Sequence, residues 1–363
     1  MGAPVLLCNE NRGFGGGEVH TVALARVLAR HGCAITLLCR RDSWLDGAAA
    51  EIDRRHAPFA NEIDALTVLK AGLLLRHHSV AHAHAGRDHL LVGTAARLRG
   101  VPMVRTLHSF LEPSLSGLSR RVLQRHTDRV ICVSNALRAQ ALEYGVPPDR
   151  AVVIPNGIDV SRFAPSGREA ARRALGLPLE APVVGVVSGL WDLKGPDLLL
   201  EAMARVPRVT VAIAGDGPME AQLRGMAEAN AMSDRVVFLG RLSDPRPVYA
   251  AADLVVMASR QDAFPLVALE AQACGRPLVA FAVGGIPEAS VNGVTSVLVE
   301  PRDTAGLAQA VSALLDDPAR AEAMGRAAEA HVREHFSEDV MAGRVIALYE
   351  AVIEARARGE HAR

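Results

Sequence analysis

The feature that most constrains this chain is an alternation, along almost its whole length, between short apolar runs and segments with helical periodicity. Runs such as Val80–Ala83 are too short for helices, whereas Glu18–Arg30 has helical spacing and is followed by Gly32. This alternation indicates parallel strands joined by crossover helices, an α/β fold. The predicted strands are Pro4–Cys8, Ala34–Cys39, Val80–Ala83, Met103–Leu107, Val130–Val133, Val152–Ile154, Val183–Ser188, Val209–Ala214, Val236–Leu239, Leu254–Ala258, Leu278–Ala280 and Ser296–Val299.

The alternation begins a second time after Asn156–Pro165, a segment rich in turn-forming residues. A chain of 363 residues is long enough for two domains of ordinary size. We therefore predict two doubly wound, Rossmann-like domains, residues 1–160 and 161–336, followed by a long helix within residues 337–363. Ligands of such sheets bind beyond the carboxyl ends of the strands, so we expect the two domains to face each other across a binding cleft.

Charge and cysteine content narrow the class of protein. The net charge is zero, which gives no indication of nucleic-acid binding, but residues 1–165 hold 20 basic and 14 acidic residues. A basic first half suits an anionic acceptor or an acidic membrane surface, and chance scatter explains it equally well. The five cysteines form no CxxC pair, and no run approaches the roughly 20 apolar residues of a membrane span. Because the first residues indicate a strand and not a signal peptide, we expect a cytoplasmic protein, in solution or at the inner face of the membrane.

The segment from Asp262 to Glu270 places two carboxylates around an apolar run. If a helix begins near Pro265, its first amides form an anion site, with Asp262 before it and Glu270 little more than one turn inside. An acid at the entrance, free amides and an inner acid suit a sugar linked through phosphate to a ribose. An ordinary capped helix with a solvated glutamate is the alternative.

Glycine-rich turns follow several of the predicted strands. Gly13–Gly17 follows the first strand and opens a helix, as an anion site or a purely structural turn does, and a nicotinamide-binding turn is a further alternative. Lys194 lies at a strand-to-helix junction, where its charge can neutralise a phosphate without a metal. Gly215–Pro218 and Gly284–Glu288 also follow strands, and the missing side chains of Gly215–Pro218 are expected to leave room for a flat ring or a ribose.

Histidines and arginines supply further candidates. His82 and His84 share one face of a strand, but no third ligand has recognisable spacing, so structural histidines are favoured over a metal pair. His108 ends a predicted strand, where it is expected to contact substrate. A basic amphipathic face for anionic lipid, or simply a solvated helix face, is indicated by Arg120, Arg121, Arg125 and Arg129.

Together these motifs resemble those of the retaining glycosyltransferases of the GT-B fold known as glycosyl transferases group 1, or family 4. The resemblance covers nearly the whole chain and rests on the Gly15–Gly17 turn, Ile154–Asp159, Lys194-Gly195, Gly215–Pro218 and the two acids at Asp262 and Glu270. It implies an acceptor in the first domain, a nucleotide-sugar donor in the second, and a last helix that crosses back to the first domain.

Carried over by motif, Lys194 is implied to hold the donor diphosphate, Glu270 the ribose hydroxyls and Asp262 the transferred sugar. With His108 near the reacting centre, the implied catalytic residues are Asp262, His108 and Lys194. No metal site and no cofactor are implied, the nucleotide-diphosphate sugar being a substrate. The implied donor-binding residues are Gly16, Gly17, Gly189, Lys194, Gly217, Leu266, Val267, Glu270 and Gly285.

The chain departs from the family pattern at two positions. The family commonly has glutamate at the position of Asp262, and arginine in the loop before the lysine, where this chain has Ser188-Gly189-Leu190. Loss of that guanidinium removes a charge-assisted phosphate contact, on the order of 1.5–3 kcal/mol.

The resemblance implies transfer of a hexose-like sugar from a UDP- or GDP-linked donor to a glycan or lipid-linked acceptor, with retained configuration. The implied setting is assembly of cell-envelope polysaccharide, lipopolysaccharide or exopolysaccharide. Two alternatives stay open: a degenerate nucleotide-sugar-binding protein without activity, suggested by the two departures, and a nucleotide-sugar epimerase of the same architecture.

Overall fold

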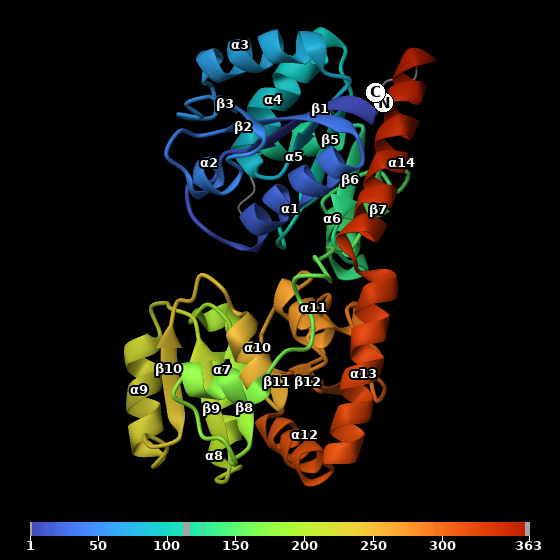
Figure 1. Cartoon of the computed structure of the whole chain (residues 1–363). Coiled ribbons are helices and arrows are strands. Elements are labelled where there is room, and N and C mark those ends of the chain that lie inside the picture. The colour runs from blue at the N-terminus through green and yellow to red at the C-terminus, as the bar shows by residue number, and fades with distance from the viewer. Residues whose placement is uncertain (1, 112–116, 126, 360–363) are drawn as a thin grey trace. The chain divides into compact units, whose positions relative to one another are not determined.

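The computed structural model describes residues 2–111, 117–125 and 127–359 of the chain. It consists of two compact units, each built around one parallel sheet (Figure 1). The first unit comprises Met1–Gly157 and Glu338–Arg363, and the second comprises Ile158–Ser337. The chain therefore passes between units at residues 157/158 and 337/338, close to the predicted boundaries at 160/161 and 336/337.

The first unit holds a seven-stranded sheet with the order β3-β2-β1-β4-β5-β6-β7. Its strands are β1 (Gly2–Asn9), β2 (Cys33–Cys39), β3 (Asp53–His56), β4 (Val80–Ala83), β5 (Met103–Leu107), β6 (Arg129–Cys132) and β7 (Ala151–Val153). Its helices are α1 (Gly16–Arg30), α2 (Trp44–Ala48), α3 (Ala65–Leu74), the 3-10 turn η1 (Leu75–His77), α4 (Gly86–Arg99), α5 (Gly117–Arg125), α6 (Asn135–Glu143) and α14 (Glu338–Ala357).

Helices cover both faces of this sheet because successive strand residues point to opposite sides. Val5 and Leu7 of β1 pack into a core with α1 and α14. Leu6 and Cys8, from the same strand, pack on the other face against α3 and α4. The last helix of the chain thus belongs to the core of the first unit, and Figure 1 shows α14 beside α1.

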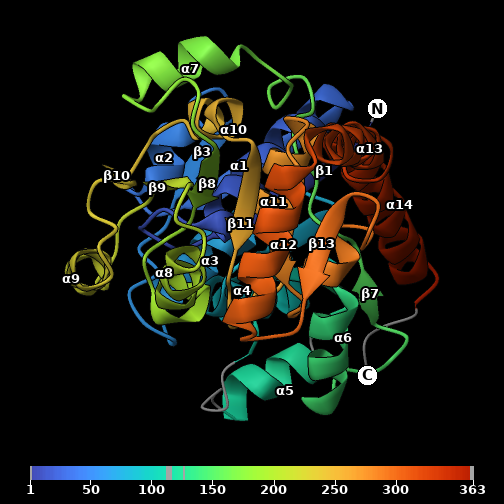
Figure 2. The same ribbon diagram turned by 90° about the horizontal axis from the view of Figure 1, so that it is seen from below.

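The second unit repeats the architecture with six parallel strands in the order β10-β9-β8-β11-β12-β13. Its strands are β8 (Val183–Val187), β9 (Thr210–Ala214), β10 (Val236–Gly240), β11 (Leu254–Met257), β12 (Leu278–Phe281) and β13 (Ser296–Val299). Its helices are α7 (Arg168–Ala174), η2 (Asp192–Lys194), α8 (Pro196–Ala204), α9 (Glu220–Ala229), α10 (Arg246–Ala251), α11 (Leu266–Ala273), η3 (Ile286–Glu288), α12 (Thr304–Asp316) and α13 (Pro318–His335). Figure 2 shows α11 and α13 of this unit side by side.

Each sheet has one point at which the strand order reverses. In the first unit it lies between β1 and β4, and in the second between β8 and β11. The connections after the two central strands leave toward opposite edges there, which opens a space at the carboxyl ends of the strands. The candidate site residues should therefore gather at these two places.

Two expectations about the chain's class can be compared with the structure. The five cysteines, which form no CxxC pair, are all buried and free. Within the described residues, no helix combines the length and the apolar character needed to cross a membrane.

Candidate functional site

The reversal point of the second sheet brings together the lysine and the first acid of the candidate site. Lys194 ends η2, in the connection after β8, and Asp262 lies in the connection after β11. The Nζ atom of Lys194 donates to Oδ2 of Asp262 over 2.5 Å. The Asp262 side chain is only 8% exposed, whereas that of Lys194 is 37% exposed. The cation is therefore accessible to a ligand, and its present partner is a carboxylate.

The two connections that carry this pair are held against each other by their backbones. Gly195 has a left-handed φ of +59°, and a Cβ atom there would lie 2.0 Å from the carbonyl oxygen of Ala258. An ion pair adds a second link, because the guanidinium of Arg260, after β11, donates to both carboxylate oxygens of Asp197, in α8, at 2.8 and 2.6 Å. A paired guanidinium and carboxylate fix orientation as well as distance. These two contacts thus fix the backbone near Lys194 relative to the backbone near Asp262.

The glycine turns have a different use from the one that the sequence suggested. At Gly217 (φ +159°) a Cβ atom would lie 2.5 Å from the carbonyl oxygen of Leu190, and at Gly215 one would lie 1.8 Å from that of Ser188. The expectation that these missing side chains leave room for a ring is wrong, because the neighbouring loop fills the space. Gly284 similarly abuts the carbonyl of Asp262, which also accepts a 3.0 Å bond from the amide of Gly285. These glycines let the loops at the carboxyl edge pack together.

Helix α11 presents its first turn beside Asp262, as the sequence predicted. It begins at Leu266, with Pro265 as the residue before the helix and not within its first turn. The amides of Leu266 and Val267 belong to the first turn and have no partner within the helix, so they can donate to an anion. The predicted acid, amides and inner acid therefore follow one another along one connection.

Glu270 lies inside α11 and is buried, so the alternative of a solvated glutamate is wrong. It is 9% exposed, and its Oε2 accepts a 2.6 Å hydrogen bond from the hydroxyl of Tyr249 in α10. Burial raises the pKa of the Glu270 carboxyl, and the bond from Tyr249 opposes that shift. Tyr249 is itself fully buried and was missed by the sequence analysis. Only the need of a buried carboxylate for a donor could have indicated such a partner.

Gly189 occupies the position at which the family commonly has arginine, and a tryptophan lies over it. A Cβ atom at Gly189 would be 2.7 Å from Cδ1 and 3.0 Å from Nε1 of Trp191. The Trp191 side chain is 59% exposed. Arg260 does not take the place of that arginine, because its guanidinium is bound to Asp197. Lys194 is thus the cation of the connection after β8, and its side chain is 37% exposed.

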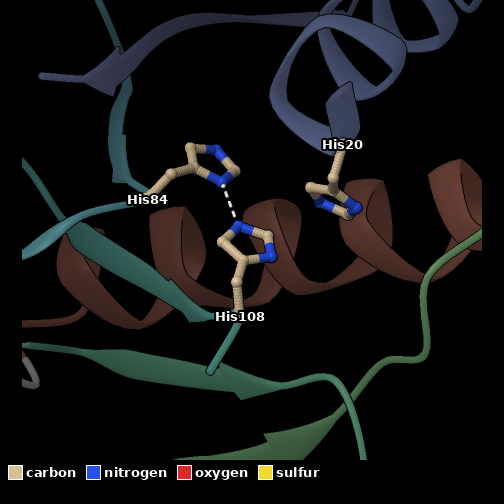
Figure 3. Close-up of side chains that lie close together, drawn as sticks. All are labelled: His20, His84 and His108. Carbon is tan, nitrogen blue, oxygen red and sulfur yellow. Dashed lines mark hydrogen bonds between the residues drawn. The ribbon is translucent and has the colours of Figure 1, made fainter. Parts of the chain in front are cut away.

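The reversal point of the first unit holds three neighbouring histidines (Figure 3). His20 comes from α1, His84 follows β4, and His108 follows β5. The Nδ1 atom of His84 and the Nε2 atom of His108 are 3.0 Å apart and share a hydrogen bond. The rings of His20 and His108 have centroids 4.7 Å apart. Gly17 makes room for this cluster, since a Cβ atom there would lie 3.4 Å from the His108 ring.

Burial keeps these imidazoles neutral. It lowers the pKa of His20 to about 4 and lowers the pKa of both His84 and His108 well below the usual value. Nδ1 of His20 and Nε2 of His84 are buried without a hydrogen-bond partner. Because a neutral imidazole donates with one nitrogen and accepts with the other, the cluster suits hydroxyl groups. Around Gly16 there is open space, since no atom lies within 4 Å of a Cβ built there.

His82 has a separate, structural role. Its Nδ1 atom is 2.6 Å from the hydroxyl of Tyr349 in α14, and its Nε2 atom is 2.8 Å from Oγ1 of Thr106. Both ring nitrogens are thus used, one to bind α14 to the sheet and the other to link β4 with β5. The prediction of a structural histidine holds for His82, whereas His84 points into the cluster.

His82 and His84 were considered as a metal pair for which no third ligand had recognisable spacing, and in the structure His84 lies instead with two other histidines. Ligand atoms of His20, His84 and His108 all lie within 4.8 Å of one another. His20 was not predicted as a member of this cluster because it is far from the other two histidines along the chain. In the described part of the chain, one further group of three has comparable spacing, namely Cys39, Asp46 and His56.

The predicted basic face for lipid is only partly formed. In α5, Arg120 and Arg121 are exposed, but Val122 and Leu123 are buried, so they offer no apolar surface to a bilayer. Figure 2 shows α5 beside α6, where Arg120 donates to the carbonyl of Tyr144. Arg129 lies in β6, and the side chain of Arg125 is outside the described residues.

Comparison with known proteins agrees with this architecture. The family described as Glycosyltransferase Family 4 matches residues 14–162, and the family described as Glycosyl transferases group 1 matches residues 167–331. The D-inositol 3-phosphate glycosyltransferase of Mycobacterium avium is 33% identical over 385 residues, covering 93% of this chain and 89% of the relative. That of Mycolicibacterium smegmatis is 34% identical, covering 88% and 82%.

Solved structures show the same fold. The Anabaena protein HepE, determined in complex with UDP-glucose, superposes with a TM-score of 0.87 at 23% identity, covering 96% of this chain and all of HepE. Both units, their parallel sheets and the returning last helix are thus those of a two-domain GT-B protein. The chain belongs to the GT-B glycosyltransferases of the group 1 family.

Proposed function

We propose that this chain transfers a hexose-like sugar from a nucleoside-diphosphate donor to a hydroxyl group of its acceptor, with retained configuration. The observation that carries the proposal is the arrangement at the carboxyl edge of the second sheet: an accessible cation at Lys194, the free first-turn amides of α11, and the buried acid Glu270. These groups suit, in order, a diphosphate, its oxygens, and a ribose.

The diphosphate competes with Asp262 for the lysine. Lys194 is bound to the Asp262 carboxylate, and two anions close to one ammonium repel each other. A bound diphosphate therefore takes over Lys194 and turns the Asp262 carboxylate toward the sugar. Glu270 accepts from the ribose hydroxyls with the oxygen that Tyr249 does not use. Gly189, Gly217 and Gly285 act through the loop backbones that frame this site, and Gly16 and Gly17 allow close approach in the first unit.

The chemistry follows from where charge develops. As the glycosidic bond breaks, negative charge grows on the diphosphate, where Lys194 and the amides of Leu266 and Val267 stabilise it without a metal or a cofactor. The acceptor hydroxyl attacks from the face that the diphosphate leaves, and its proton passes to the leaving phosphate oxygen. His108 orients the hydroxyls near the reacting carbon. Asp262 and Glu270 do not form the acid and nucleophile pair of a glycosidase.

The donor and acceptor are proposed from different sources. A UDP-linked donor is favoured by the UDP-glucose complex of HepE, with a GDP-linked donor as the alternative. The names of the relatives make inositol 3-phosphate the first acceptor to assay, and the basic first half of the chain suits its phosphate. A glycan or lipid-linked acceptor in cell-envelope or exopolysaccharide assembly is the second candidate.

The test is an assay of nucleotide release over a panel of UDP- and GDP-sugars, with and without each acceptor. We expect release that rises when the correct acceptor is present, and a product whose anomeric configuration by NMR matches that of the donor. An inverted product would contradict retention. Activity that is abolished by chelators and restored by a metal ion would contradict the metal-independent route.

The degenerate alternative is favoured by one observation, the replacement of the arginine by Gly189 beneath Trp191. It predicts donor binding, measured by calorimetry, without acceptor-dependent release. An epimerase would instead convert the donor into a second nucleotide sugar in the absence of any acceptor, and chromatography of the donor after incubation distinguishes this outcome.

A further inference from the structure

Exposed apolar side chains gather on and beside one helix of the first unit, α3. Of the eleven large apolar side chains exposed in the described part of the chain, four follow one another at Ile63, Leu66, Leu69 and Leu73, and a fifth is Leu98. Their exposed fractions are 84, 51, 59, 46 and 77%. Contiguous exposure of this kind marks a surface that contacts another body.

The pattern along α3 shows that this exposure is organised. Leu66, Leu69 and Leu73 are three and four residues apart and so form one stripe on the helix. Thr67 and Ala71, on the opposite side, are buried, and Ala71 packs into the core beneath the helix. The helix is therefore apolar on its outer face as well as its inner one, although only the inner face packs within the unit.

A groove accompanies the stripe. It lies between α3 and α4, which Figure 1 shows side by side, and has a volume of about 910 Å³. Its lining includes Ile63, Leu69 and Leu98, together with Arg97 and Arg99 from the last turn of α4. The Arg99 side chain reaches α3, since a Cβ atom at Gly72 would lie 3.7 Å from its Nε atom.

The charges around this surface have one predominant sign. The exposed basic residues on α3, the following turn and the end of α4 are Lys70, Arg76, Arg97 and Arg99, against the exposed acid Glu62. In an isologous dimer the same patch would meet itself, and these like charges would oppose one another. An apolar stripe with a cationic border instead complements an anionic lipid surface, where leucines enter the boundary of the acyl chains and cations meet phosphates.

We propose that α3 and the end of α4 form a docking surface for a membrane that contains anionic lipid. The helix lies in the plane of the interface and does not span the bilayer, in keeping with its ten residues. This assignment moves the predicted membrane contact from α5, whose described apolar side chains Val122 and Leu123 are buried, to a helix whose leucines are exposed. The surface contains none of the candidate site residues, so the proposal can fail without affecting the proposed transferase activity.

The test is co-sedimentation of the full chain with vesicles of phosphatidylcholine alone and of phosphatidylcholine mixed equally with phosphatidylglycerol. We expect binding to the mixed vesicles that weakens as salt is raised. The triple substitution Leu66→Gln, Leu69→Gln, Leu73→Gln should reduce the partition coefficient at least about tenfold. Arg97→Gln with Arg99→Gln should reduce it several-fold and flatten the salt dependence.

Matched controls come from exposed residues of the second unit. Leu179→Gln with Val294→Gln removes exposed apolar side chains, and Arg326→Gln with Arg333→Gln removes exposed cations, so both pairs should bind vesicles like the wild type. Circular dichroism and nucleotide release check that every variant is folded. The proposal is overturned if the wild type does not bind the anionic vesicles or if the triple variant binds them like the wild type. Equal binding to both vesicle types, or a wild-type dimer in light scattering that the triple substitution dissociates, would also overturn it.

Discussion

The two reversal points of this molecule have the same backbone architecture and opposite chemistry. In the second unit the point between β8 and β11 carries charge, with Lys194 bound to Asp262 and the acid Glu270 nearby. In the first unit the point between β1 and β4 carries neutral imidazoles, of which His84 and His108 share a hydrogen bond. A charged site suits a diphosphate, and a neutral site of donors and acceptors suits hydroxyl groups. The same fold thus carries two different chemistries at its two reversal points.

The largest effect is expected at the lysine. Lys194→Ala removes the accessible cation at the reversal point of the second sheet, and we expect kcat/KM to fall by about 10²–10³-fold, as for the loss of one stabilising group in a transition state. The chain has one other lysine, Lys70, and Lys70→Ala is the matched control. Steady-state nucleotide release measures both. Wild-type kinetics of the Lys194→Ala variant would show that Lys194 does not stabilise the leaving diphosphate.

The neutral histidines of the first unit should affect how its free energy of unfolding depends on pH. The pKa of His20 is lowered to about 4 in the folded protein, whereas the pKa of a histidine in the unfolded chain is about 6.5. Between these values the unfolded state binds more protons, so the stabilisation present above pH ~6.5 is lost as the pH falls, by about 1.4 kcal/mol per pH unit for this group. We expect the free energy of unfolding of the His20→Gln variant to fall less steeply as the pH is lowered.

Each unit contains one tryptophan, so the first unit can be followed separately. Fluorescence of Trp44 in a Trp191→Phe background reports its unfolding by urea at several pH values. His77→Gln, at an exposed histidine, is the control and should leave the pH dependence unchanged. An unaltered slope in His20→Gln would show that His20 is not held neutral.

A smaller effect is expected at the buried acid. Glu270→Ala should raise the donor KM by about 10–100-fold, corresponding to about 1.5–3 kcal/mol for a charge-assisted bond, with little change in kcat. Tyr249→Phe removes the hydroxyl that Glu270 accepts from and should raise KM less. Glu228→Ala, at an exposed acid of α9, serves as the control. If Glu270→Ala lowers kcat at constant KM, the proposed contact with the ribose is wrong.

The smallest effect concerns the missing guanidinium. Gly189→Arg restores a cation but must displace the exposed Trp191, so we expect donor KM to fall by no more than about tenfold, about 1.4 kcal/mol. Adding Trp191→Ala should increase the gain by clearing the space. Weaker donor binding in both variants would show that this loop does not face the diphosphate.

Much of the fold could be predicted from the sequence because buried parallel strands have continuous apolar runs. Twelve strands were predicted close to their observed positions, and Val80–Ala83 has the predicted ends. The strand β3, Asp53–His56, was missed because it lies at the sheet edge and consists of Asp-Arg-Arg-His, with no apolar residue. Its pairing with β2 comes from backbone hydrogen bonds, which require no particular residue type and so give no pattern in the sequence.

The candidate site was predictable where it is local in the chain. The order of Asp262, the first amides of α11 and Glu270 follows from one short segment. Contacts between distant segments were not predictable: the pairing of Lys194 with Asp262, the hydroxyl of Tyr249 on Glu270, and His20 beside His108 all depend on which strands are neighbours. The glycine turns were assigned to ligands because a sequence does not show which backbone approaches them.

The central claim, that the charged reversal point binds the donor diphosphate, can be tested through the two lysines. Amine labelling followed by mass spectrometry measures the modification rate of Lys194 and Lys70 in one sample. We predict that a saturating UDP-sugar strongly slows labelling of Lys194 and leaves Lys70 unchanged. Equal labelling of Lys194 with and without the nucleotide sugar, under conditions in which calorimetry shows it to be bound, would contradict the account.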